Sequence, residues 1–115
     1  MVDISIDAAK SLLPHGIKVA VANIHSLKPL DTNFILENSK LASVVVTAEN
    51  HSIIGGLGSA VAETLLEGGL SRKFKRIGIE DTFAEGGSTE FLFNKYGLNS
   101  INIQNTIKRL INDGQ

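Results

Sequence analysis

The chain has 115 residues, a length that fits one domain with a single hydrophobic core. Its 11 Lys and Arg residues balance 12 Asp and Glu residues, which leaves a formal charge of -1 and excludes the strongly basic surface of a nucleic-acid binder. It contains no cysteine, so disulfides, thiolate metal sites and cysteine nucleophiles are excluded. No signal peptide is recognisable, and no apolar run approaches the roughly 20 residues that span a bilayer. We therefore expect a cytoplasmic protein that binds neither nucleic acid nor membrane.

The first part of the sequence alternates helix and strand patterns. Apolar residues at helical spacing predict a helix over residues 4–13, which the Pro-His-Gly sequence at residues 14–16 ends. Residues 17–24 have the composition of a strand. Asp31 is a suitable N-cap for the short helix that follows it.

The alternation continues to the end of the chain. Residues 44–48 are continuously apolar, as expected of a parallel strand covered on both faces. The later predicted elements are a helix from Leu57 to Gly68, a strand at residues 75–80, a helix at residues 88–97 and a last helix from about Ser100. Strands separated by helices predict an α/β fold, a three-layer αβα sandwich around a mainly parallel sheet.

The glycine-rich stretch after the second predicted strand is the main candidate site, because ligands of parallel sheets bind at the carboxyl ends of strands. It reads ENHSIIGGLGSAVAE at residues 49–63. Its glycines would let backbone N–H groups approach an anion at the start of the next helix. Close packing of helix against sheet is the alternative. The candidate anion-binding or interface residues are Glu49, Asn50, His51, Gly55, Gly56, Gly58 and Ser59.

No catalytic constellation is visible in the sequence. The three histidines have no acidic partner at metal-ligand spacing, and no Gly-x-Ser-x-Gly elbow marks a hydrolase nucleophile. Glu80 and Asp81 end the third predicted strand, where a magnesium site and an ordinary helix-capping loop are both possible. We expect no catalytic residue and no metal ligand in this chain.

Three segments, in this order, resemble the C-terminal domain of transketolase, which deoxyxylulose-phosphate synthase and the beta subunits of 2-oxo acid dehydrogenases share. They are LKPLD at residues 27–31, VVVTAENHSIIGGLGSAVAE at residues 44–63 and IGIEDTFAEGGSTEFLFNKYGLNSINIQNTIKRLI at residues 77–111. The resemblance implies that thiamine diphosphate and magnesium bind to other domains, at a dimer interface. The complete enzyme would transfer a two-carbon ketol unit between sugar phosphates, in pentose phosphate metabolism.

The resemblance implies a structural and dimer-contact role for this domain, with no cofactor of its own. Its partners would be the diphosphate-binding and pyrimidine-binding domains or a subunit that carries them, in a homo-oligomer. The isolated chain would then be inactive. The alternative is an independent regulatory module that binds an anion or a phosphorylated metabolite at residues 49–63.

The sequence departs from the family pattern at its start. Relatives have an apolar strand and a glycine-containing turn before the first helix, whereas this chain begins at Met1, inside that turn. We expect a single, N-terminally short domain over residues 1–115 that is a piece of a longer polypeptide. The absent strand would lie between residues 17–24 and 43–48, and its absence would expose two strand edges. Direct pairing of these two segments, or pairing with another copy, is the alternative.

Overall fold

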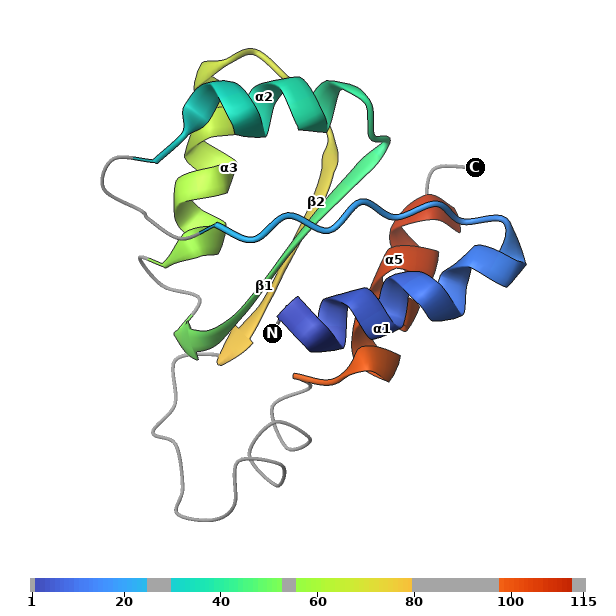
Figure 1. Ribbon diagram of the computed structural model, residues 1–115. Coiled ribbons are helices and arrows are strands. Elements are labelled where there is room, and N and C mark those ends of the chain that lie inside the picture. Colours follow the sequence, from blue (N-terminus) through green and yellow to red (C-terminus); the bar gives the residue numbers. More distant parts are fainter. Residues whose placement is uncertain (1, 25–29, 53–55, 80–97, 113–115) are drawn as a thin grey trace.

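The computed structural model describes residues 2–24, 30–52, 56–79 and 98–112 (Figure 1). In chain order the elements are α1 (Val2–Leu12), a 3-10 turn (Leu13–His15), α2 (Thr32–Lys40), β1 (Val44–Ser52), α3 (Leu57–Glu67), β2 (Lys73–Ile79) and α5 (Ser100–Asn112). The predicted helix at residues 88–97 lies outside the described residues, as does the acidic pair Glu80 and Asp81, for which a magnesium site and a helix-capping loop were the two alternatives. No described helix is long and apolar enough to cross a membrane.

β1 and β2 form a parallel two-stranded sheet in the described part of the chain. The pairing runs in register from Val44 opposite Lys73 to Ala48 opposite Ile77. Beyond Ala48 the register shifts, and the next paired residue of β1 is Ser52, opposite Ile79. Such an irregularity bends a strand and redirects its side chains, and here it falls on the predicted site.

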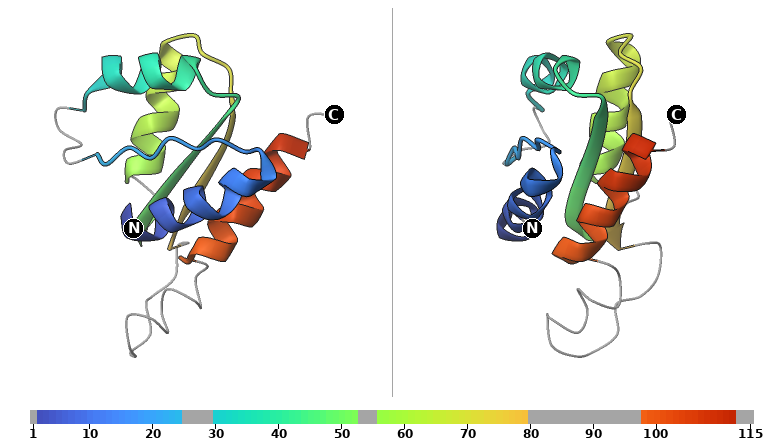
Figure 2. Two further views of the ribbon diagram at one scale, coloured as in Figure 1. Left: turned by 45° about the vertical axis from the view of Figure 1, so that its right-hand side comes forward. Right: turned by 90° about the vertical axis from the view of Figure 1, so that its right-hand side faces the viewer.

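Helices cover both faces of this sheet (Figure 2). On one face, Val44, Val46 and Ala48 of β1 pack into a cluster with α1 and α5. On the other face, Val45 of β1 and Phe74 of β2 pack against α2 and α3. The predicted α/β fold with a parallel strand covered on both sides is thus confirmed. The buried apolar residues of the first cluster are Ala8, Leu12, Ile77, Leu98, Ile103 and Ile107, and those of the second are Ile35, Val61 and Leu65.

Polar contacts fix both ends of α2. At its start, Asp31 Oδ1 accepts a hydrogen bond from the Phe34 N–H at 3.0 Å, which confirms the predicted N-cap. At its end, Arg72 Nε donates to the carbonyl oxygens of Ser39 and Ala42, at 3.2 and 2.7 Å, and Nη2 donates to that of Lys40 at 3.3 Å. A guanidinium at this position satisfies terminal carbonyls and complements the negative end of the helix dipole.

The predicted strand at residues 17–24 is absent as a paired strand. These residues cross the molecule in front of β1 in Figure 1, but within the described part of the chain they form no ladder with β1 or β2. An extended segment becomes part of a sheet only when a neighbour of suitable spacing accepts its hydrogen bonds. Direct pairing of residues 17–24 with β1, one expected alternative, is therefore not what the structure adopts.

Candidate functional site

The carboxyl end of β1 anchors the start of α3 through Glu49. The Glu49 side chain is only 7% exposed. Its Oε1 accepts a hydrogen bond from the Leu57 N–H at 3.1 Å, and its Oε2 accepts one from the Gly58 N–H at 2.8 Å. These N–H groups belong to the first turn of α3, where helix geometry leaves donors without intrahelical partners. The carboxylate therefore acts as an internal anion at a helix N-terminus, where negative charge is stabilising.

Gly58 lies close against the sheet. A Cβ at this position would lie 2.6 Å from Cγ and Cδ of Arg76 and 2.9 Å from Oγ1 of Thr47. The Thr47 side chain is buried, and its hydroxyl has no hydrogen-bond partner in the described structure. Because two strands supply the atoms that crowd this position, Gly58 serves helix-to-sheet packing.

The side chain of Arg76, from β2, also contacts the start of α3. Arg76 lies opposite Thr47 in the β1–β2 register, and its Nη1 donates to Ser59 Oγ at 3.2 Å at an exposed position. The positive charge of Arg76 thus lies on the same helix terminus as the carboxylate of Glu49. A single exposed contact of this kind contributes little to stability.

The structure gathers part of the predicted residue set. Glu49, Gly56, Gly58 and Ser59 meet at the α3 N-terminus, where Gly56 is the N-cap residue with φ -94°. Asn50 and His51 belong to β1, and Gly55 lies outside the described residues. A role in anion binding or in an interface stays a prediction for the whole set.

Sequence reasoning identified Glu49 as a candidate but missed what it binds, and it missed Arg76 entirely. The sequence signal for Glu49 is an acidic residue at the end of a buried strand, followed within ten residues by a helix that begins with glycine. No comparable signal exists for Arg76, because its contact with Ser59 spans 17 residues.

This arrangement is better suited to holding the fold than to chemistry. An anion that bound the N–H groups of Leu57 and Gly58 would have to displace Glu49 from them, and the Ala60 N–H is bonded to the Gly56 carbonyl at 3.2 Å. A retained Glu49 would also repel the anion. Among the described residues, no group of three or more His, Cys, Asp or Glu is placed to hold a metal ion. The described residues at the start of α3 therefore do not fit a magnesium-diphosphate site.

Comparison with known proteins gives consistent matches. Residues 1–103 match the family described as "Transketolase, C-terminal domain". The chain is 48% identical over 107 residues to a 1-deoxy-D-xylulose-5-phosphate synthase of Caldanaerobacter subterraneus subsp. tengcongensis, covering 93% of this chain and 17% of the relative. It is 45% identical over 91 residues to a 6-deoxy-6-sulfo-D-fructose transketolase subunit of a Clostridium species, covering 79% of this chain and 28% of that protein.

A solved structure of a transketolase is also similar to this chain. "Split gene transketolase, inactive beta4 tetramer" superimposes with a TM-score of 0.85 at 38% sequence identity, over 96% of this chain and 35% of that one. The chain thus spans about a third or less of each of these relatives.

Proposed function

Because the chain belongs to the transketolase C-terminal domain family, we propose that it is the C-terminal portion of a thiamine-diphosphate-dependent enzyme of the transketolase type. In this proposal the complete enzyme transfers a two-carbon ketol unit between sugar phosphates. This chain supplies structure and contacts between subunits. The reaction uses the cofactor's carbanion chemistry, which side chains cannot replace.

The bidentate contact of Glu49 is the observation that carries the proposal. The most ligand-like motif of the chain is its glycine-rich turn, and the first N–H groups after that turn already bind the Glu49 carboxylate at 3.1 and 2.8 Å. Because the Glu49 carboxylate already binds these N–H groups, they need no phosphate as a partner. The proposal therefore assigns thiamine diphosphate and its magnesium ion to the remainder of the enzyme, and no chemical step to this chain.

The proposal also specifies partners. The relatives include a transketolase subunit and a structure described as a tetramer of a split-gene transketolase. We propose that this chain associates with the diphosphate-binding and pyrimidine-binding portions of its enzyme in a cytoplasmic homo-oligomer, a dimer at the least. The independent phosphometabolite-binding module is not favoured, because it requires the N–H groups that Glu49 holds.

Calorimetry on the chain separates the two functions. The titrants are inorganic phosphate, ribose 5-phosphate, and thiamine diphosphate with magnesium. The proposal expects no saturable heat from any of them. Micromolar binding of a phosphate that Gly58→Val abolishes, with the helical circular dichroism unchanged, would establish the independent module instead.

A further inference from the structure

The first turn of α3 binds a carboxylate through main-chain groups. Glu49 Oε1 accepts a hydrogen bond from the Leu57 N–H at 3.1 Å, and Glu49 Oε2 accepts one from the Gly58 N–H at 2.8 Å. Main-chain N–H groups at a helix start recognise the negative charge and the oxygen atoms of an anion, whatever molecule carries them. A carboxylate that is not part of this chain would therefore satisfy the same two donors.

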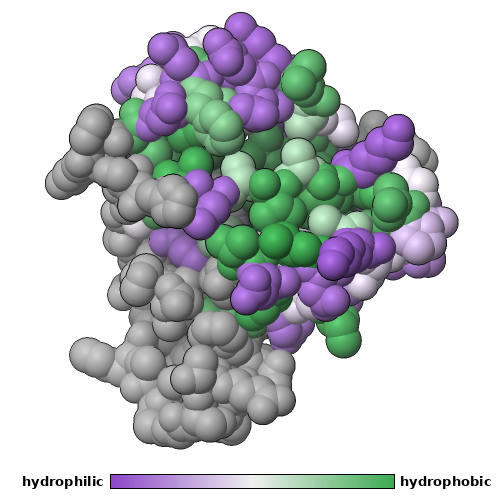
Figure 3. All heavy atoms as spheres, in the orientation of Figure 1, coloured by the Kyte–Doolittle hydropathy of each residue, from purple (hydrophilic) through white to green (hydrophobic). Residues whose placement is uncertain are grey.

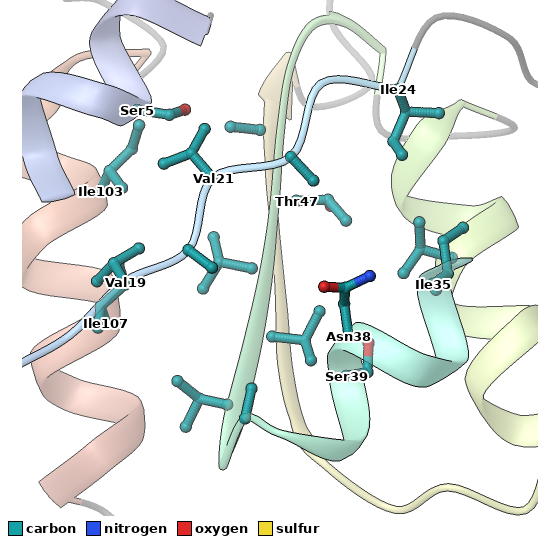
Figure 4. Close-up of a pocket in the computed structure, with 18 of the residues that line it drawn as sticks. Ser5, Val19, Val21, Ile24, Ile35, Asn38, Ser39, Thr47, Ile103 and Ile107 are labelled. Atoms are coloured by element: carbon teal, nitrogen blue, oxygen red, sulfur yellow. The ribbon is translucent and has the colours of Figure 1, made fainter. Parts of the chain in front are cut away.

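A buried hydroxyl beside these donors has no partner in the described structure. Thr47 is only 6% exposed, and its Oγ1 makes no hydrogen bond there. This oxygen lies 2.9 Å from the position that a Cβ at Gly58 would take, and Figure 4 shows Thr47 on the side of β1 that faces α2 and α3. Buried polar groups almost always have a hydrogen-bond partner. The Thr47 hydroxyl therefore marks a place for an acceptor next to the Gly58 N–H.

A carboxylate has the capacity to accept the Thr47 hydroxyl in addition to the two N–H groups. Its two oxygens offer about four acceptor positions, and the N–H groups of Leu57 and Gly58 use two of those of Glu49. The Glu49 carboxylate is tied to β1 by its own side chain, and in this position it does not bond to Thr47. A free carboxylate of the same size has no such tether, so it can turn to accept all three donors.

A cavity of about 1050 Å³ gives a small ligand access to the start of α3. Four residues of this region are among those that line it: Thr47, Glu49, Gly56 and Leu57. Elsewhere its lining is largely apolar, with Ile103 and Ile107 of α5 on one flank in Figure 4, and apolar side chains gather across the middle of this face of the molecule in Figure 3. Apolar walls offer an anion no hydrogen bond, so a carboxylate that enters the cavity would be held at its polar end beside α3.

We propose that the start of α3 is a binding site for a small aliphatic carboxylate, formed by the N–H groups of Leu57 and Gly58 and by the hydroxyl of Thr47. In the native chain the side chain of Glu49 fills this site. When residue 49 has a shorter side chain, the site takes a free carboxylate of the size of the missing atoms, and Thr47 Oγ1 donates a third hydrogen bond to it. The site is formed within this chain, so it is independent of the proposed enzymatic function.

Rescue of Glu49→Ala by acetate tests the site, because this substitution removes the methylene and carboxylate that acetate replaces. In the 115-residue variant, sodium acetate should raise the Tm in a saturable manner, by about 5 °C when acetate is at about ten times its Kd. It should also shift the NMR resonances of the Leu57 and Gly58 amides. Acetate added to the parent chain, and sodium chloride of the same ionic strength added to the variant, should do neither. If the variant is unfolded without ligand, acetate should restore its helical circular dichroism, and failure to do so overturns the proposal.

Two further substitutions of Glu49 test the size of the site. Glu49→Gly removes one methylene more than Glu49→Ala, so propionate should bind it about fourfold more tightly than acetate does, whereas acetate should be the better ligand of Glu49→Ala. Glu49→Gln is the matched control, because its side chain still fills the site, and neither carboxylate should raise its Tm more than that of the parent chain. The proposal is wrong if the alanine, glycine and glutamine variants respond alike to both carboxylates.

Thr47→Val tests the hydroxyl, because valine keeps the shape of threonine and lacks its donor. In the parent chain, where the hydroxyl has no partner in the described structure, this substitution should change the Tm by no more than about 2 °C. In the Glu49→Ala background it should weaken acetate binding about tenfold, because a hydrogen bond to a charged ligand is lost. Equal acetate affinity with and without the hydroxyl would contradict the role of Thr47 in the site.

Discussion

Replacement of Glu49 by Gln tests the internal anchor of α3. The change keeps the size of the side chain and one carbonyl acceptor, but it places an NH₂ group against an N–H donor. Glu49 accepts two hydrogen bonds, from Leu57 at 3.1 Å and from Gly58 at 2.8 Å, in a position that is 7% exposed. One charge-assisted hydrogen bond contributes about 1.5–3 kcal/mol, and the loss of negative charge at the helix start adds about 0.3–1 kcal/mol.

We therefore expect Glu49→Gln to lower the free energy of unfolding by about 2–3 kcal/mol, and Glu49→Ala, which removes both acceptors, to lower it further. For a domain of this size, a loss of this magnitude lowers the Tm by roughly 10 °C. Urea unfolding followed by circular dichroism measures the first quantity, and a thermal melt measures the second.

Glu63→Gln is the matched control, because Glu63 is exposed in the middle of the same helix. This variant should stay within about 0.5 kcal/mol of the parent chain. Faster amide exchange at Leu57 and Gly58 in Glu49→Gln would locate the effect at the helix start. The reasoning fails if the Glu49 and Glu63 variants unfold at the same urea concentration.

Three further changes test the packing and the helix ends. Gly58→Ala should lower the free energy of unfolding by about 1–3 kcal/mol through overpacking. The same change should cost less in an Arg76→Ala variant, which lacks the atoms 2.6 Å from the new Cβ. An equal loss in the parent chain and in the Arg76→Ala variant would refute the contact. Arg72→Ala should cost about 1–3 kcal/mol in urea unfolding by uncapping α2, with Arg72→Lys intermediate and the exposed Lys75→Ala close to neutral. Asp31→Ala should cost about 1 kcal/mol in the same assay, and Asp31→Asn much less, because Asn retains the acceptor for the Phe34 N–H.

The features that sequence predicts well here are those set by neighbouring residues. The Asp31 cap joins residues three positions apart, and the glycines after residue 67 end α3 as expected. The continuous apolar run at residues 44–48 correctly indicated a strand covered on both faces. In each case the determining contacts lie within one helical turn or follow from the alternation of a single strand.

Pairing and long-range capping were not predictable. Residues 17–24 have strand composition, but whether they join a sheet depends on a neighbour that composition does not specify. The contacts of Arg72 with the end of α2 span 30 to 33 residues. The contacts of Glu49 with Leu57 and Gly58 span eight and nine residues, and the register shift between Ala48 and Ser52 leaves no clear mark in the sequence. The structure brings Glu49, Gly58 and Ser59 together at the start of α3, whereas their role in anion binding or in an interface stays a prediction.

The activity of a chimera tests the central claim most directly. In the 1-deoxy-D-xylulose-5-phosphate synthase of Caldanaerobacter, the 107 residues that match at 48% identity would be replaced by the corresponding part of this chain, and synthase turnover would be measured with thiamine diphosphate and magnesium. The account predicts turnover within about tenfold of the parent enzyme, none when the region is deleted, and none from this chain alone. Turnover by the isolated chain, or an inactive chimera that still assembles and binds the cofactor, would contradict it.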